Sequence, residues 1–310
     1  MEWARTTVTP NSPGQVHSYF AYGIGIHCDV ELPDLPRAKN SADVVVKYGK
    51  AEPLHPVASG AKWCIQFKDD EAYFFYDKLG MCRVRKGREI IGEPCEGANE
   101  EELGLLAQGP GLSVLLHQRG YVTLHASCVS TAAGAVAFVG KSGSGKSVLA
   151  AALHSSGYGL IADDVTVVDA DANEPIVYPG YPQCHLMPDA AEYFGYDKKK
   201  SAEVKSTQEK IAWAAHKGFP IHPVALRCIY LLHEGPEFRI EPVSRHRALF
   251  ELVRHSYWIR FVHDARPSSY FLQCGKICGK VPVRTLSRPK SMNMLPELLI
   301  MLERDFSAVA

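Results

Sequence analysis

Short apolar runs, broken by clusters of Pro, Gly and Asp, fill the first third of the chain. Runs rich in Tyr, Phe, Val and Ile with polar breaks at this spacing are typical of a small β-rich domain. We expect strands at residues 19–26, 42–48, 63–67, 72–76 and 80–86. No set of residues with catalytic potential stands out among them. We therefore assign residues 1–100 to a small β-rich N-terminal domain and place the boundary near residue 100.

The pattern changes after this boundary, where helical and strand-like segments alternate. Residues 100–119 have a mostly helical pattern, and an apolar strand is expected at residues 122–129. This alternation predicts an α/β fold for the second domain, residues 101–310. Further strands are expected at residues 135–139, 160–163, 225–233 and 238–243, a hairpin with arms 165–169 and 175–178, and helices at 148–155, 245–254 and 292–305.

The charge balance excludes several classes of partner. The chain has 310 residues, 46% of them hydrophobic, and its 34 basic and 34 acidic residues cancel. A chain of this length can bury a sizeable core, whereas its neutral charge argues against nucleic acid or an anionic membrane as a partner. No apolar run reaches the length of a membrane span, and residues 1–15 lack the apolar region of a signal peptide. We therefore expect a cytoplasmic protein.

Nine cysteines are scattered along the chain without a Cys-x-x-Cys pair. An odd, scattered set in a cytoplasmic protein favours reduced, mostly structural thiols. The one close pair is Cys274 and Cys278, which has neither a second pair nor histidines at zinc-finger spacing, so a metal site there is disfavoured.

Residues 140–147 read Gly-Lys-Ser-Gly-Ser-Gly-Lys-Ser after the apolar run at 135–139. This is a complete phosphate-binding loop, whose glycines let backbone N–H groups face the phosphates of a nucleotide. Lys146 is expected to reach the β and γ phosphates, and the Ser147 hydroxyl to bind Mg²⁺. The helix at 148–155, capped by Gly157, would point its N-terminus at the phosphates, which argues against a chance match. The residues expected to bind ATP are Gly140, Ser142, Gly143, Ser144, Gly145, Lys146 and Ser147.

A pair of carboxylates, Asp163 and Asp164, ends the next apolar strand. A strand that follows such a helix by a short turn generally returns beside the first strand, which would bring both aspartates to the phosphates. Phosphoryl transfer uses one carboxylate to hold Mg²⁺ and one to accept the proton of the attacking hydroxyl. Two adjacent carboxylates repel each other, so we expect one raised pKa unless a metal offsets it. A strand-end pair that only caps a turn is the alternative.

Residues 124–127, 137–147 and 159–164 together resemble the kinase domain of the HPr kinase/phosphorylase family. The resemblance implies a phosphate-loop serine kinase that uses ATP and Mg²⁺. It also implies that Asp163 is the catalytic base, that His125 lies close to that carboxylate, and that Asp164 supports Mg²⁺ and the loop. A histidine that leaves an apolar strand is otherwise often only a hydrogen-bonded structural residue.

Four other segments, residues 19–23, 31–35, 181–182 and 254–257, are similar to a diverged branch of HPr kinase-like proteins. Members of that branch occur with the maturation of ribosomal peptides, and some phosphorylate the C-terminal serine of lasso-peptide precursors. The resemblance therefore implies a precursor peptide as the substrate.

Two departures count against a phosphocarrier substrate and the reverse phosphorylase reaction. The chain lacks the family's Glu-x-Arg-Gly-x-Gly signature, and Val148 stands where an acidic residue would follow the loop. A regulatory GTPase is disfavoured because no asparagine is followed by lysine. A phosphocarrier kinase, a small-molecule kinase and a noncatalytic docking protein ordered by nucleotide stay open, as does a homo-oligomeric state. Arg254 and Arg260 are candidates for an arginine that stabilises the transferred group.

Overall fold

The computed structural model describes residues 16–29, 31–32, 34–39, 41–96, 98, 100–195, 210–257 and 267–308. The chain separates into two compact units: residues 21–23 belong with 116–310, and the rest of the chain up to Leu115 forms the first unit. The division thus follows Leu115, whereas the sequence places a boundary near residue 100. The reason is that α1 (Glu100–Leu106) and the π-helical turn η1 (Ala107–Gly111) pack against the first unit's strands. No helix in these ranges is long and apolar enough to cross a membrane.

The first unit is built on a seven-stranded mixed sheet with the order β1-β2-β3-β7-β6-β5-β4. β2, β3 and β7 run parallel, and β4 to β7 form an antiparallel meander. The expected strand at residues 19–26 is two strands, because Tyr22 and Gly23 both have positive φ and form a tight turn. The strands are β1 (His17–Ala21), β2 (Ile24–Cys28), β3 (Val44–Tyr48), β4 (Trp63–Lys68), β5 (Glu71–Tyr76), β6 (Gly80–Arg85) and β7 (Glu89–Pro94).

The second unit contains an eight-stranded sheet and a separate two-stranded sheet. In the large sheet β8, β11, β12 and β15 are successive neighbours, and β9 pairs with both β8 and β15. The large sheet comprises β8 (Val122–Thr131), β9 (Gly134–Val139), β10 (Gly159–Ala162), β11 (Val165–Asp169), β12 (Ile176–Tyr178), β15 (Val224–Glu234), β16 (Arg239–Pro242) and β17 (Val283–Arg288). The small sheet pairs β13 (Gln183–Leu186) with β14 (Ile211–Ala214).

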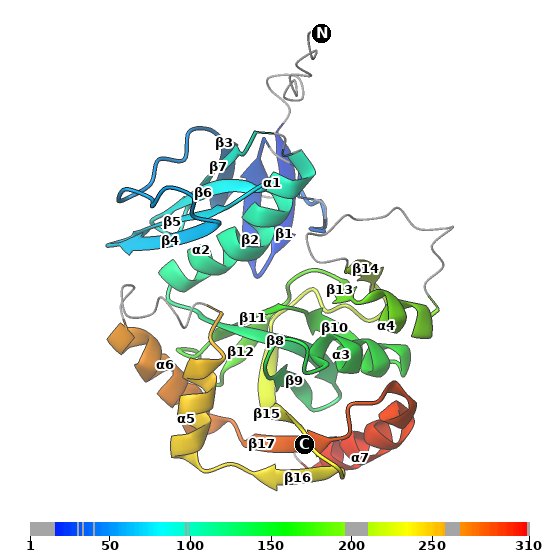
Figure 1. Cartoon of the computed structure of the whole chain (residues 1–310). Helices are drawn as coiled ribbons and strands as arrows, with labels where there is room; N and C mark the ends of the chain where they lie inside the picture. The colour runs from blue at the N-terminus through cyan, green and yellow to red at the C-terminus, as the bar shows by residue number, and fades with distance from the viewer. Residues whose placement is uncertain are drawn as a thin grey trace. The chain divides into compact units, whose positions relative to one another are not determined.

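Helices cover both faces of the large sheet (Figure 1). Val136 and Phe138 of β9 are buried in a cluster with α3 (Lys146–Ser155) and α7 (Leu295–Ala308). The alternate β9 residues, Ala135, Ala137 and Val139, are buried in a cluster with α5 (Arg245–Arg254) and α6 (Pro267–Lys280). Burial on both faces explains why the strand is apolar throughout, as expected for the parallel β9–β15 pair. The remaining helices of the described chain are α2 (Leu112–Gln118), α4 (Pro188–Tyr193) and the 3₁₀ turn η3 (Met292–Met294).

The sequence analysis expected the strand after α3 to lie beside β9, but it does not. β10 and β11 instead pair one after the other with β8, antiparallel, with Ala162 opposite Cys128 and Val165 opposite His125. The two neighbours of β9 are β8 and β15, so β9 has no free edge for β10. Asp163 and Asp164 therefore reach the region of the loop by way of β8.

α6 and β17 were not predicted, whereas α5 has the bounds that the sequence predicts. The buried apolar stripe of α6 consists mainly of Tyr270, Cys274, Ile277 and Cys278, at helical spacing. Two of these residues are cysteines, which do not indicate a helix in the sequence. Cys274 and Cys278 are thus core residues one turn apart. The described part of the chain holds no group of three or more His, Cys, Asp or Glu side chains placed to bind a metal ion.

Gly134, the first residue of β9, is expected to tolerate no side chain. Its φ is +136°, and a Cβ atom would lie 2.6 Å from the Ala225 carbonyl oxygen. We expect Gly134→Ala to lower the free energy of unfolding by at least about 2 kcal/mol in urea titrations. The matched control is Gly275→Ala in α6, where a Cβ meets nothing within 4 Å and stability should rise by about 0.5–1 kcal/mol. Equal effects of the two substitutions would contradict this account.

Candidate functional site

The 140–147 loop joins the end of β9 to the start of α3, in the strand-loop-helix order that the sequence predicts. Gly143 and Gly145 both have left-handed backbone conformations, with φ of +74° and +84°. Gly145 is the residue that precedes the first turn of α3. These conformations let the chain turn sharply into the helix without a Cβ penalty.

Lys146 is a buried cation within this loop. Its side chain bends back so that Nζ donates hydrogen bonds to the carbonyl oxygens of Gly140 at 2.9 Å and Lys141 at 3.1 Å. The residue is 5% exposed. Burial lowers the pKa of the Lys146 ammonium to about 8, and the charges of Asp163 and Asp164 oppose this shift. Neutral carbonyls compensate a buried positive charge only in part, so the site favours an added anion.

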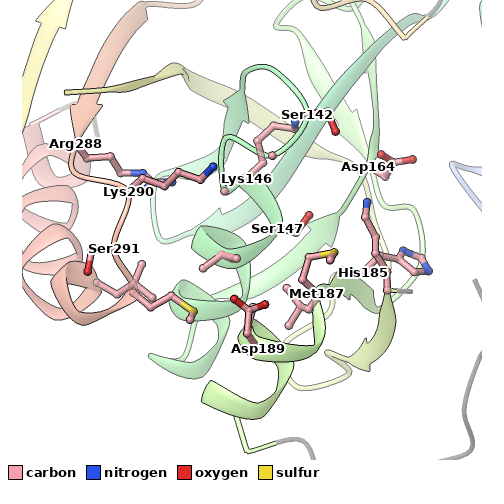
Figure 2. Close-up of a pocket in the computed structure, with 18 of the residues that line it drawn as sticks. Ser142, Lys146, Ser147, Asp164, His185, Met187, Asp189, Arg288, Lys290 and Ser291 are labelled. Carbon is pink, nitrogen blue, oxygen red and sulfur yellow. The ribbon is translucent and has the colours of Figure 1, made fainter. Parts of the chain in front are cut away.

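A cavity of about 400 Å³ opens over the loop and the first turn of α3 (Figure 2). Of the residues predicted for the site, those that line it are His125, Ser142, Gly143, Gly145, Lys146, Ser147 and Asp164. Its other walls are Val148, His185, Leu186, Met187, Asp189, Ala190, Lys210, Arg288, Lys290, Ser291, Met292 and Leu295. Figure 2 shows Lys290 extending from one side toward Lys146, whose own side chain turns toward Ser142, with Asp164 and His185 on the other side.

Asp163 is brought near the loop but does not line the cavity. It is 2% exposed. Its Oδ1 accepts a hydrogen bond from the Ser127 hydroxyl at 2.5 Å, and its Oδ2 accepts one from the His185 backbone N–H at 3.0 Å. These contacts tie β8 to β13 through a buried carboxylate. Gly140 and Ser144, also predicted to bind ATP, are likewise not in the cavity wall.

Asp164 faces the cavity from a strained position between β10 and β11. Its φ is +65°, an uncommon conformation for a residue other than glycine. Oδ1 lies 3.0 Å from Nδ1 of His125, and Oδ2 accepts a hydrogen bond from the Tyr257 hydroxyl at 3.3 Å. Its side chain is 34% exposed. The histidine thus pairs with the second aspartate, which corrects the expectation that His125 lies against Asp163.

The expected repulsion between the two carboxylates does not raise the pKa of Asp164. Burial alone would raise it, but the hydrogen bond and charge of His125, with the charges of Lys210 and His185, lower the pKa of Asp164 to about 2. Asp164 is therefore ionised over the whole physiological pH range.

The neighbours of His125 fix the position of its ring proton. Its Nδ1 lies 3.0 Å from the Asp164 carboxylate and 3.2 Å from the Asp164 carbonyl oxygen, both of which are acceptors. In the neutral form of the ring Nδ1 therefore carries the proton and Nε2 holds the electron pair. Tyr257 packs against the ring edge at 6.1 Å between centroids. The pair has the arrangement of a base oriented by a carboxylate.

Arg288 and Lys290, at the end of β17, are site residues that the sequence analysis missed. Both line the cavity, and Arg288 donates a hydrogen bond to the Ser144 carbonyl oxygen at 2.6 Å. The sequence signal is the short strand pattern at 283–288 closed by Pro289. Arg254, by contrast, is 59% exposed and lies 3.9 Å from Glu251, away from the cavity wall. Arg260 lies outside the described residues.

The oxygen atoms present at the cavity fit the chemistry of Mg²⁺. Ser147 contributes a hydroxyl and Asp164 an ionised carboxylate from opposite elements of the wall. In nucleotide sites Mg²⁺ commonly takes one or two protein oxygens and completes its shell with phosphate oxygens and water. Ser147 and Asp164 are the residues that would hold it.

The chain is similar to a solved structure, the HPr(Ser) kinase/phosphatase of Coxiella burnetii, at 16% sequence identity and a TM-score of 0.33. The match covers 60% of this chain and 96% of that chain. No protein-family model matches the chain, and no curated protein matches it. The function is therefore inferred from the chain's own residues.

The buried ammonium of Lys146 predicts a pH-dependent stability. Its pKa is about 8 in the folded protein, against 10.5 for a lysine exposed to water, as in the unfolded chain. Between these two pH values the unfolded chain binds more protons than the folded protein, so stability rises with pH. We expect the unfolding free energy of the wild type to rise relative to Lys146→Met over this range, by up to about 1.4 kcal/mol per pH unit. Phe250→Met is the control: it changes an exposed position without an ionisable group, so its unfolding free energy should differ from that of the wild type by the same amount at every pH. A flat difference between wild type and Lys146→Met would refute the assignment.

Proposed function

We propose that this chain is a kinase that transfers the γ-phosphoryl group of ATP to a hydroxyl acceptor, with Mg²⁺ as cofactor. One observation carries the proposal: a buried lysine, whose hydrogen bonds within the described residues go to two neutral carbonyl oxygens, lies at the wall of a cavity where a strand and loop lead into a helix. A polyphosphate would supply an anion in direct contact with this lysine, whose hydrogen bonds otherwise go to carbonyl oxygens. The same wall holds an ionised aspartate and an oriented histidine.

The phosphate chain of ATP would bind along the 140–147 loop. Lys146 would exchange its contacts with two carbonyl oxygens for contacts with phosphate oxygens, which compensate its charge more fully. Ser147 and Asp164 would hold Mg²⁺, which neutralises charge on the phosphates. Lys146 also neutralises charge that spreads over the transferred group in the transition state.

His125 is the proposed acceptor of the hydroxyl proton. Its ring lines the cavity, and Asp164 engages Nδ1, so Nε2 of the neutral ring would hold the electron pair that takes the proton. As the acceptor oxygen bonds to the γ-phosphorus and the bond to ADP breaks, the proton passes to Nε2. This replaces Asp163 as the base, since Asp163 is buried and does not line the cavity. We propose that Asp163 instead positions β8 and β13.

The acceptor is proposed to be a serine near a flexible end of a ribosomally made precursor peptide. The support for this class is the resemblance of residues 19–23, 31–35, 181–182 and 254–257 to peptide-tailoring kinases. A flexible end can enter the cavity without unfolding a domain, and the rate then depends on placing its hydroxyl in line with the γ-phosphorus.

Substitutions at His125 and Asp163 separate the two candidate bases. His125→Gln should lower turnover by about 10²- to 10⁴-fold, the usual size of general-base catalysis, with ATP affinity little changed. Asp163→Asn should mainly lower the melting temperature, because it removes a buried charge that accepts two hydrogen bonds. The measurements are single-turnover rates, ATP affinity by calorimetry, and thermal unfolding.

The opposite pattern would restore Asp163 as the base. A folded Asp163→Asn variant without turnover, beside a His125→Gln variant with full turnover, would show that the buried carboxylate becomes accessible in the substrate complex.

The reaction and its acceptor are tested by mass spectrometry. A precursor peptide and a phosphocarrier protein are each incubated with the protein, ATP and Mg²⁺, and inorganic phosphate is added afterwards. We expect phosphate on the peptide serine alone, no removal of it by inorganic phosphate, and no product with Lys146→Ala, which lacks the charge at the phosphates. A phosphorylated phosphocarrier, or its dephosphorylation by inorganic phosphate, would favour a phosphocarrier kinase instead.

A further inference from the structure

Arg288 is a second buried cation at the cavity, contributed by an element far along the chain from the loop. It ends β17 and is 7% exposed. One Nη donates to the Ser144 carbonyl oxygen at 2.6 Å and the other to the Pro289 carbonyl oxygen at 3.2 Å. Nε is buried and has no hydrogen-bond partner among the described residues. The guanidinium, which belongs to a residue of the cavity wall, therefore retains one unused donor.

Within the described residues no carboxylate forms a salt bridge with Arg288. Burial lowers the pKa of its guanidinium, and the more distant Glu234 opposes this shift. A buried charge without a counter-ion is costly, and proteins generally compensate it with an anion or a fully satisfied network. Carbonyl oxygens and an unsatisfied Nε do not complete such a network.

The loop is shaped to admit this guanidinium. A Cβ atom at position 145 would collide with Nη2 of Arg288, so glycine is needed there for the approach as well as for its positive φ. Arg288 thereby reaches the carbonyl of Ser144, two residues before Lys146. Figure 2 shows Arg288 and Lys290 extending from the same side toward Lys146.

We propose that Arg288 is a phosphate-binding residue of this site, which contacts the phosphate chain of the nucleotide alongside Lys146. The inference rests on the proposed function, since it assumes that the cavity takes a nucleotide. A guanidinium presents several N–H donors in one plane and binds phosphate oxygens with two of them at once. Arg288 then supplies the arginine that the sequence analysis sought at Arg254 and Arg260.

The test compares binding of ATP and of inorganic tripolyphosphate, both with Mg²⁺, by calorimetry. Arg288→Gln should weaken both ligands by about 10- to 100-fold, the range for a lost hydrogen bond to a charged group. Arg288→Lys, which retains the charge without the planar fork, should recover part of the loss. Tripolyphosphate has no base or ribose, so an equal loss for both ligands locates the contact at the phosphates.

Arg284→Gln is the matched control on the same strand. Arg284 pairs with Asp305 and does not line the cavity, so this variant should lose stability without losing affinity for either ligand. Thermal unfolding without ligand completes the comparison. Removal of Arg288 should leave the melting temperature close to that of the wild type, because the loss of its two hydrogen bonds to carbonyl oxygens is offset by removal of a buried charge without a counter-ion.

Three outcomes would overturn the inference. Unchanged affinity of folded Arg288→Gln for both ligands, with a lowered melting temperature, would make Arg288 a structural support of the loop. A loss for ATP but not for tripolyphosphate would assign it to the base or ribose. If the wild type binds neither ligand, the proposed function fails together with this inference. If the wild type binds ATP and either of the first two outcomes is found, only the inference about Arg288 fails and the proposed function stands.

Discussion

The second unit is organised around a positive charge that is held out of water. Lys146 is buried against two backbone carbonyls at the point where β9 becomes α3. This arrangement requires left-handed glycines before the helix, a strand buried on both faces, and walls that keep solvent from the ammonium. Because carbonyls compensate the charge incompletely, the free energy of the site is lowest with an anion bound. This is the basis of the proposal that the cavity takes a polyphosphate.

The elements around Lys146 come from three distant parts of the chain. β8 provides His125, the bend between β10 and β11 provides Asp164, and the end of β17 provides Arg288. β8 is the organising strand, since β9, β10 and β11 all pair with it. Its pairing places Ser127 against Asp163 and His125 against Asp164, so the two adjacent carboxylates enter different surroundings. Asp163 is buried and accepts two hydrogen bonds, whereas Asp164 faces the cavity with its pKa lowered.

Local patterns were sufficient where the sequence carries its own turn and capping signals. The loop, α3 and the β11–β12 hairpin have nearly the expected bounds, because glycines, a helix start and short polar turns mark them. α6 was missed because its buried stripe includes two cysteines and a tyrosine. The predicted β10–β9 pairing was wrong because strand order depends on which edges are free, and β9 already has β8 and β15 as neighbours.

The sequence by itself determined that a buried strand, a glycine-rich loop with Lys146 and Ser147, and a helix follow one another, because these features are encoded within about a dozen consecutive residues. It also placed two aspartates shortly after them. Only the tertiary structure decided which aspartate faces the cavity, that His125 pairs with Asp164, and that Arg288 reaches the loop. These decisions depend on strand pairing and on burial across long separations, and neighbouring residues in the sequence carry no signal for them.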